Sequence, residues 1–321
     1  MLFFKTHKDQ FFGLGMLVLF IVGMGMIIAY TGWAETAASL AKLGWGQMAI
    51  LLGLSLGNYA LRALRWHLLS RALHLPISLM RNGVIYLAGF ALTITPGRVG
   101  ELVRLRWIQR DTGTKMLQSA PMMLGDRAAD LAGVAVLLLI AALLGLGGAG
   151  GVYWVAALSL VLAFLTTNPK LLTVLITVSW RSLGRGARLF AGLRRAVRQL
   201  SLFTTAQVAL PVLALSTLGW LMEGYSFYLL LGWLGVGLGF WMAVGVFLFS
   251  MLGGGATGMP GGLGGAEAVM VGLLSLQGVP LEISLPATII IRITTLWFAI
   301  LIGILIFPIA ERKGPQHALE K

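Results

Sequence analysis

Long runs without a single charged residue constrain this chain more than any other feature of its sequence. They cover residues 10–34, 43–61, 131–169, 199–222 and 224–266. About 20 apolar residues, at a rise of roughly 1.5 Å each, cross a hydrocarbon core of about 30 Å. The chain is therefore predicted to be an all-α polytopic membrane protein. The alternating segments of about 10 residues that build a membrane β-barrel are missing from the sequence.

The composition supports this class. The chain is 58% hydrophobic and only 11% charged, and its mean hydropathy is +0.90. Soluble domains carry about 25% charged residues. The net charge of +13 is attributed to cytoplasmic loops and to contact with anionic lipid at the cytoplasmic face, and nucleic acid is not an expected partner.

Several kinds of chemistry are not expected. The chain has no cysteine, which excludes disulfides and thiolate sites, and its four histidines show no metal-ligand spacing. No Ser/His/Asp set, HExxH motif or nucleotide-binding loop occurs. We therefore expect no metal, no cofactor, no catalytic residues and no ATP-driven movement.

The charges between the runs predict one transmembrane domain over residues 1–321 with about six spanning helices. Half-repeats of roughly 1–170 and 200–310 are joined by a basic cytoplasmic linker at 181–203. In the linker, apolar residues recur at helical spacing opposite arginines, at Leu189, Leu193, Val197 and Leu200. This pattern is typical of an amphipathic helix on an anionic leaflet, and a plain topology anchor is the alternative.

Lysines and arginines set the expected orientation, because they concentrate in cytoplasmic loops. Lys5 and Lys8 place the N-terminus in the cytoplasm, and the arginines between 181 and 198 place the linker there. Arg312 and Lys313 do the same for the C-terminus. The predicted location is the bacterial cytoplasmic (inner) membrane, with a multi-pass chain and both termini cytoplasmic.

Two glycine- and proline-rich breaks interrupt apolar runs in matching places. ITPGRVGE at 94–101 and GMPGGLGGAE at 258–267 share the pattern Pro-Gly-x-(Val/Leu)-Gly, and a glutamate, Glu101 or Glu267, follows each. Their flanking charges predict two oppositely oriented re-entrant hairpins, near 82–97 and 240–278. Such a pair is typical of an inverted repeat whose inward-pointing helix N-termini favour anions. The alternative is that both breaks are ordinary turns and that the match is coincidental.

Charged residues inside apolar segments are candidate functional residues, because each costs about 2.5–3.5 kcal/mol or more. Glu223, Glu267 and Arg292 are of this kind. The structural alternative for these three is an internal ion pair, for which we predict coupling between Arg292 and Glu223.

Two further groups of charges lie near predicted helix ends. Arg62 and Arg65 are placed at the end of the second helix, where snorkelling to lipid headgroups would also explain them. Asp126, Arg127 and Asp130 open the third helix, where their spacing allows an i,i+3 pair. For the second group the structural and functional interpretations are equally open.

Five segments in order resemble one membrane family: NYALRALRWHLL, TPGRVGELVRL, GDRAADLAG, MPGGLGGAEAVMVGLLSLQGVP and IIIRITTLWFAILIG. Over nearly its whole length the chain is similar to the flippase-like family of the lysylphosphatidylglycerol synthase transmembrane region, the membrane half of bacterial multiple peptide resistance factors. The resemblance implies movement of lipid between leaflets. In the two-domain proteins a soluble domain aminoacylates phosphatidylglycerol. This chain is expected to be a stand-alone member without that domain, because it ends soon after its last helix.

The leading hypothesis is a flippase for an anionic or modified phospholipid, a polyprenyl-linked lipid or a hopanoid-type lipid. Arginines would gather a headgroup phosphate on the inner side and Arg292 would hold it near the midplane, with Glu223 and Glu267 as counter-charges or proton carriers. The predicted substrate-binding residues are Arg62, Arg65, Pro96, Gly97, Arg98, Gly100, Glu101, Arg104, Asp126, Arg127, Asp130, Glu223, Pro260, Gly261, Gly264, Glu267 and Arg292.

Two alternatives from other classes stay open. An intramembrane lipid-phosphate enzyme of the phosphatase type also uses inverted re-entrant segments, although TPGRVGE has no serine between Pro96 and Glu101. The other alternative is a non-transporting scaffold for a lipid-synthesis enzyme. Besides the lipid substrate, the candidate partners are that enzyme and a second copy of the chain.

Overall fold

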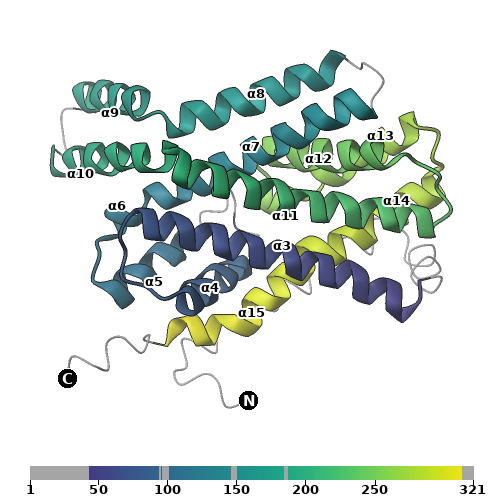
Figure 1. The fold of residues 1–321 in the computed structure, drawn as a ribbon, viewed down its shortest axis with the longest axis horizontal. Helices are drawn as coiled ribbons and strands as arrows, with labels where there is room; N and C mark the ends of the chain where they lie inside the picture. The colour runs from purple at the N-terminus through teal and green to yellow at the C-terminus, as the bar shows by residue number, and fades with distance from the viewer. Residues whose placement is uncertain (1–42, 94, 96–100, 146–149, 184–186, 313–321) are drawn as a thin grey trace.

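The computed structural model describes residues 43–93, 95, 101–145, 150–183 and 187–312. These residues form helices joined by short turns, and no strand occurs among them (Figure 1). The predicted all-α class is confirmed. The first predicted span, residues 10–34, lies outside the described residues.

The described helices follow one another with few long connections. In chain order they are α3 (Trp45–Ala72), α4 (Leu79–Ala88), η1 (Gly89–Leu92), α5 (Val103–Thr112), α6 (Met116–Ser119), α7 (Pro121–Leu144), α8 (Gly150–Thr167), α9 (Pro169–Leu183), α10 (Ala187–Arg198), η3 (Gln199–Thr204), α11 (Ala206–Trp233), α12 (Phe240–Ala256), η4 (Pro260–Gly262), α13 (Gly265–Leu276), α14 (Leu281–Arg292), the π turn η5 (Ile293–Trp297) and α15 (Phe298–Glu311).

Three of these stretches are long and apolar enough to cross a membrane, namely Met116–Leu144, Ala206–Trp233 and Leu281–Glu311. A fourth span would be the pair Tyr153–Thr167 and Pro169–Arg181, which is bent by 65°. The described residues thus hold three or four apolar spans, whereas about six were predicted for the whole chain.

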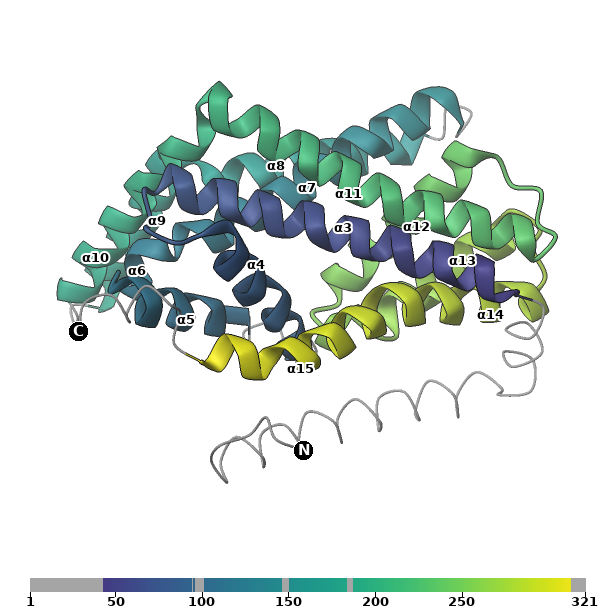
Figure 2. The same cartoon turned by 60° about the horizontal axis from the view of Figure 1, so that its bottom comes forward.

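The long helices α3 and α11 lie side by side and run in opposite directions (Figures 1 and 2). Each has 28 residues. Gly219 of α11 allows a close approach, because a Cβ there would lie 2.5 Å from the Asn58 Oδ1 of α3. This contact brings the polar middle of α3 against the otherwise apolar α11.

The two long helices also end alike. Leu73 and Leu234, the C-caps of α3 and α11, both have φ −86° and ψ 6°. The next residue is left-handed in each case, His74 with φ 55° and Gly235 with φ 83°. A left-handed residue after the last turn lets backbone amides return to the helix's final carbonyls. After α3 and after α11, the chain therefore reverses direction through the same kind of turn. Each turn leads into a pair of shorter helices with a break between them: α4–η1 and α5 in the first half, and α12 and α13 in the second.

The second broken pair agrees closely with the prediction for 240–278. Helices α12 and α13 pack against each other, and a Cβ on Gly254 would lie 2.6 Å from the Ala266 Cβ. The first pair begins at Leu79 and reaches Thr112, with its break partly outside the described residues. Whether either pair is re-entrant stays a prediction.

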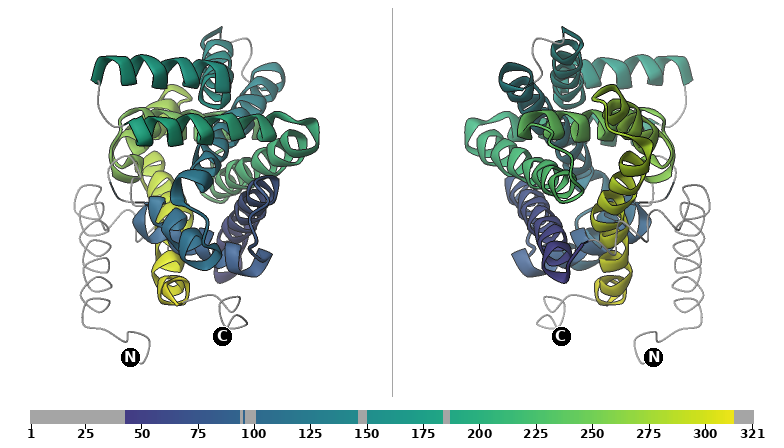
Figure 3. Two further views of the ribbon diagram at one scale, coloured as in Figure 1. Left: turned by 90° about the vertical axis from the view of Figure 1, so that its left-hand side faces the viewer. Right: turned by 90° about the vertical axis from the view of Figure 1, so that its right-hand side faces the viewer.

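The predicted amphipathic linker contains helix α10, which lies beside α9 at one edge of the molecule (Figures 1 and 3). On the apolar side of the linker, Val197 of α10 and Leu200 of the following η3 are buried. Gly192 faces α6, because a Cβ there would lie 2.4 Å from a Leu117 methyl group. Part of the apolar face is thus covered by protein, and contact with an anionic leaflet stays a prediction for the basic face.

Candidate functional site

Arg65 is the centre of a buried charged cluster. Its Nε and Nη2 donate to Asp126 Oδ1 at 3.0 and 2.6 Å, and its Nη1 donates to Asp130 Oδ1 at 2.7 Å. Nη1 also donates to Ser216 Oγ at 2.8 Å. The residue has no exposed surface. Helix α3 continues to Ala72, so the prediction that Arg65 ends its helix is wrong, and snorkelling does not explain it.

Arg62 lies about one turn earlier on α3 and extends the cluster toward α11. Its Nη1 lies 3.4 Å from Asp130 Oδ2, its Nε donates to Asn58 Oδ1 at 3.0 Å, and its guanidinium lies 4.5 Å from the centre of the Trp220 ring. Asn58 Nδ2 in turn donates to Glu223 Oε1. Arg62 is also buried inside the helix, which corrects its predicted place at the helix end.

At its other end the cluster reaches the first break. Arg127 Nη2 donates to Glu101 Oε2 at 2.9 Å and to Asp126 Oδ2 at 3.3 Å. Its Nη1 lies 3.7 Å from Asp130 Oδ2, which confirms the predicted i,i+3 pair. One third of the Arg127 side chain is exposed, at 33%, against 11% or less for Asp126, Asp130 and Glu101. Arg127 is therefore the most exposed arginine among the described members of the cluster.

Arg104 also pairs with Glu101, and its guanidinium is buried among aromatic side chains. Its Nη1 donates to Glu101 Oε2 at 3.1 Å, and its guanidinium lies 4.2 Å from the Tyr86 ring centre and 5.7 Å from that of Trp66. Gly89 makes room for it, because a Cβ there would lie 2.0 Å from Arg104 Nε. A fully buried guanidinium cannot gather lipid from the surface, so Arg104 does not occupy the exposed place that the prediction gave it.

These contacts form one continuous polar network inside an apolar bundle. Its members are Glu223, Asn58, Arg62, Asp130, Arg65, Asp126, Arg127, Glu101 and Arg104. Buried charges are tolerated only when hydrogen bonds and opposite charges satisfy them. The sequence singled out every charged member but missed Asn58, whose i,i+4 spacing to Arg62 was the available signal.

A second, smaller site lies at the other break. Arg292 Nε donates to Glu267 Oε1 at 2.6 Å, and Nη2 donates to the Gly261 carbonyl at 2.8 Å. Gly261 and Gly264 have φ of 62° and 79°, which glycine adopts without strain. The predicted direct pairing of Arg292 with Glu223 is not found, because each has its own partner. At Gly261 a backbone acceptor, rather than an anion-binding amide, faces the arginine.

The remaining predicted site residues belong to the two glycine- and proline-rich breaks. Pro96, Gly97, Arg98 and Gly100 lie outside the described residues, and Pro260 begins η4. Among the described residues no group of three or more acidic or histidine side chains could hold a metal ion.

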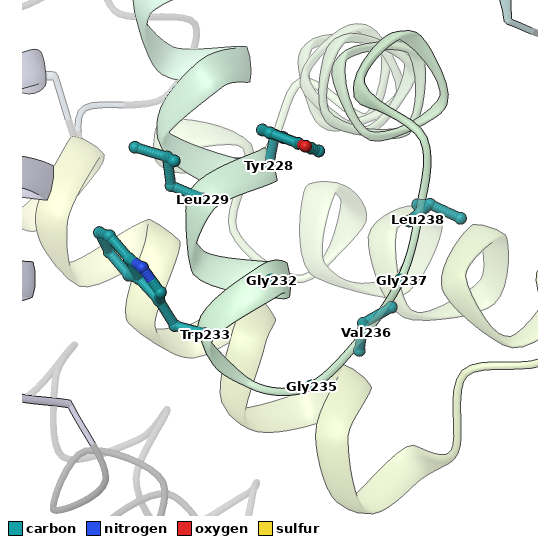
Figure 4. A pocket seen from close by; sticks show the side chains of 8 residues that line it. All are labelled: Tyr228, Leu229, Gly232, Trp233, Gly235, Val236, Gly237 and Leu238. Carbon is teal, nitrogen blue, oxygen red and sulfur yellow. The ribbon is translucent and has the colours of Figure 1, made fainter.

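An apolar hollow of about 380 Å³ lies where α11 turns into α12, between Tyr228 and Leu238 (Figure 4). Its lining residues are uncharged and none belongs to the polar network. The hollow therefore offers no charged side chain to an anionic headgroup.

Comparison with known proteins agrees with the resemblance in the sequence. A family model described as "Lysylphosphatidylglycerol synthase TM region" matches residues 12–303. A "UPF0104 membrane protein" of Methanothermobacter thermautotrophicus is 25% identical over 330 residues, covering 93% of this chain and 92% of that protein. The chain is thus a membrane protein, and it belongs to the family of the lysylphosphatidylglycerol synthase transmembrane region.

Proposed function

We propose that this protein is a flippase that moves a lipid with an anionic headgroup between the leaflets of the bacterial cytoplasmic membrane. The observation that carries the proposal is the buried network of ion pairs around Arg65, which joins α3, α7, α11 and the first break. Charged residues at membrane depth are costly and mark substrate or ion pathways. No catalytic step is assigned to the chain.

Likenesses between the two halves support an inverted repeat as the framework for transport. Helices α3 and α11 have the same length and the same C-terminal turn, and they run antiparallel (Figure 2). The following broken pairs each lead into a long helix, α7 or α14–α15. Inverted repeats in transporters place a binding site at their interface, and the Arg65 network lies at the contact of α3 with α11.

The headgroup would enter at Arg127. Its side chain is one-third exposed, and its salt-bridge partners among the described residues are Glu101 and the two aspartates of α7. A phosphate accepts two hydrogen bonds from one guanidinium, so it competes well with a carboxylate. On this proposal Glu101 occupies the anion position until a headgroup displaces it.

The proposed orientation puts both termini and the linker at 181–203 in the cytoplasm. The chain has no cysteine, so single cysteines report topology without background. A cysteine at exposed Ser201 should react with a membrane-impermeant reagent only from the inside, and one at exposed Gln277 only from the outside. The reverse pattern would refute the orientation.

The function itself is tested in proteoliposomes that contain a fluorescent phosphatidylglycerol. The intact protein should move the lipid to the other leaflet, and Arg127→Ala should slow this movement at matched folded yield. Phosphate release from a polyprenyl pyrophosphate would identify an enzyme instead. Activity of a lipid-synthesis partner that depends on this chain, without lipid movement, would identify a scaffold.

A further inference from the structure

Glu223 differs from the other acids of the network in its partner, because no described arginine forms a salt bridge with it, whereas Asp126, Asp130 and Glu101 each have one. It is the eighteenth of the 28 residues of α11, near the middle of an apolar helix long enough to cross the membrane. It is only 7% exposed. An ionised carboxylate at this depth is strongly disfavoured unless a positive charge pairs with it.

No arginine or lysine among the described residues lies within ion-pairing distance of Glu223. Its hydrogen-bond partner is Asn58, whose amide orientation is determined by Arg62. Because Arg62 Nε can only donate, Asn58 Oδ1 must face it, and Nδ2 is left to donate to Glu223. Glu223 is thus connected to the network by a neutral side chain rather than by a salt bridge.

The groups that face Glu223 come from three of the helices packed on α11. Arg62 and Tyr59 belong to α3, Asp130 to α7 and Arg292 to α14. The neighbouring α12 and η3 contain no charged residue. Both arginines already have closer acids, since Arg62 contacts Asp130 and Arg292 contacts Glu267. Each of the two arginines near Glu223 is therefore already paired with another acid, so neither forms a salt bridge with Glu223.

Counting charges shows what the protonation of Glu223 changes. The described ion-paired part of the network contains four arginines, at 62, 65, 104 and 127, and three acids, at 101, 126 and 130. Four positive charges less three negative charges leave one positive charge. A protonated Glu223 keeps that charge, and an ionised Glu223 cancels it.

We propose that Glu223 is the proton-binding site that couples protonation to headgroup binding. The inference rests on the proposed function. The carboxylate takes one proton from water at one face of the membrane, and the described part of the network then carries one more positive charge than with an ionised Glu223, which favours one anionic headgroup. Loss of that proton to water at the other face removes this added charge and releases the headgroup.

This coupling has a definite sign. Two ligands that favour the same state raise each other's affinity by the same factor. Headgroup affinity is therefore high at low pH and falls as pH rises through the titration of Glu223. For one linked proton the fall approaches about tenfold per pH unit, because each tenfold step corresponds to one unit of pKa.

The test compares wild type with Glu223→Gln, which holds the carboxyl position neutral and can still accept from Asn58. Binding of a short-chain phosphatidylglycerol to the purified protein is measured across pH. Wild type should lose affinity with rising pH, and Glu223→Gln should bind with no pH dependence. Glu282→Gln, an exposed glutamate at the start of α14, is the matched control and should keep the wild-type slope.

Two further measurements keep the proposal falsifiable. Infrared difference spectra should show a protonated carboxyl band in wild type that disappears in Glu223→Gln, whether or not lipid binds. Asn58→Ala removes a donor to the ionised carboxylate and should move the pH midpoint of this band upward. An unchanged band in Glu223→Gln, or an unchanged pH slope of lipid binding, would overturn the proton site. Absence of lipid binding in every variant would instead refute the flippase proposal.

Discussion

A glutamate–arginine salt bridge stabilises each of the two breaks in the chain, but the residues around the two salt bridges differ. In each half, a glutamate after the glycine-rich break pairs with an arginine on the next long helix. Arg127 Nη2 lies 2.9 Å from Glu101, and Arg292 Nε lies 2.6 Å from Glu267. The partners are 26 residues apart in the first half and 25 in the second. Each pair ties the chain behind a break to the helix that follows it.

The surroundings of the two pairs differ in charge. In the first half Glu101 also accepts from Arg104, and Arg127 also contacts both aspartates of α7. In the second half the other contacts of Arg292 are neutral, a backbone carbonyl and the sulfur of Met251 at 3.6 Å. The first pair has substitutes for either partner, whereas the second has none among the described side chains. The number of alternative charged partners, rather than the N–O distance, should therefore determine how much each salt bridge contributes to the free energy of unfolding.

The largest effect is expected at the centre of the charged half. Arg65→Met leaves Asp126 and Asp130 buried without their principal partner. Loss of one side of a buried ion pair typically costs about 3–5 kcal/mol. Unfolding in mixed micelles measures the change. The control is Arg71→Met on the same helix, where the side chain is exposed and about 0.5 kcal/mol or less is expected. Equal stability of the two variants would contradict the central role of Arg65.

The next largest effect is expected at the second break. Arg292→Met leaves Glu267 without its hydrogen bond, and the glutamate side chain is 20% exposed. The expected cost is about 1.5–3 kcal/mol, the range for hydrogen bonds to charged groups. Adding Glu267→Gln should restore part of it.

A double-mutant cycle measures this coupling, and a parallel cycle of Arg292 with Glu223 should give a smaller interaction energy. A larger interaction with Glu223 than with Glu267 would contradict the observed pairing. It would instead favour the coupling that the sequence predicted.

An effect of intermediate size is expected where α15 packs against η1 of the first half. Gly303 of α15 faces η1 so closely that a Cβ would lie 2.2 Å from the Ala91 amide nitrogen. Gly303→Ala should destabilise the protein by about 1–3 kcal/mol, because the helix must move away. Gly53→Ala in α3 is the control, since nothing lies within 4 Å of its Cβ position. It should be neutral or stabilising by up to about 1 kcal/mol.

The smallest change in stability is expected for Arg127→Ala. Glu101 keeps Arg104, and both aspartates keep Arg65, so each acid retains a positive partner. For a pair with an exposed arginine the expected cost is about 0–1 kcal/mol. A loss as large as that of Arg292→Met would show that redundancy does not protect the first pair.

Much of the fold could be predicted from local sequence. The second broken pair was expected at 240–278 and is found from Phe240 to Leu276. The Gly-Pro break, the positive φ of Gly261 and the charge-free runs are all properties of neighbouring residues. Arg62 and Arg65 were placed at the end of the helix that starts at Trp45, where lipid headgroups were expected, but the helix continues to Ala72 and both side chains are buried. Charge indicates a helix end only when the residue faces water, and these two face aspartates.

By itself, the sequence determined the class of protein, the places of the breaks, the candidate charges and the family. These follow from hydrophobicity, from glycine and proline, and from residue order, all of which act over short distances along the chain. Only the tertiary structure decided the pairing. Asp126 is 61 residues from Arg65, and Glu223 is 165 residues from Asn58. A buried charge must pair with an opposite charge or a hydrogen-bonding group that is close in space, and the packing of α3, α7 and α11 brings those residues together.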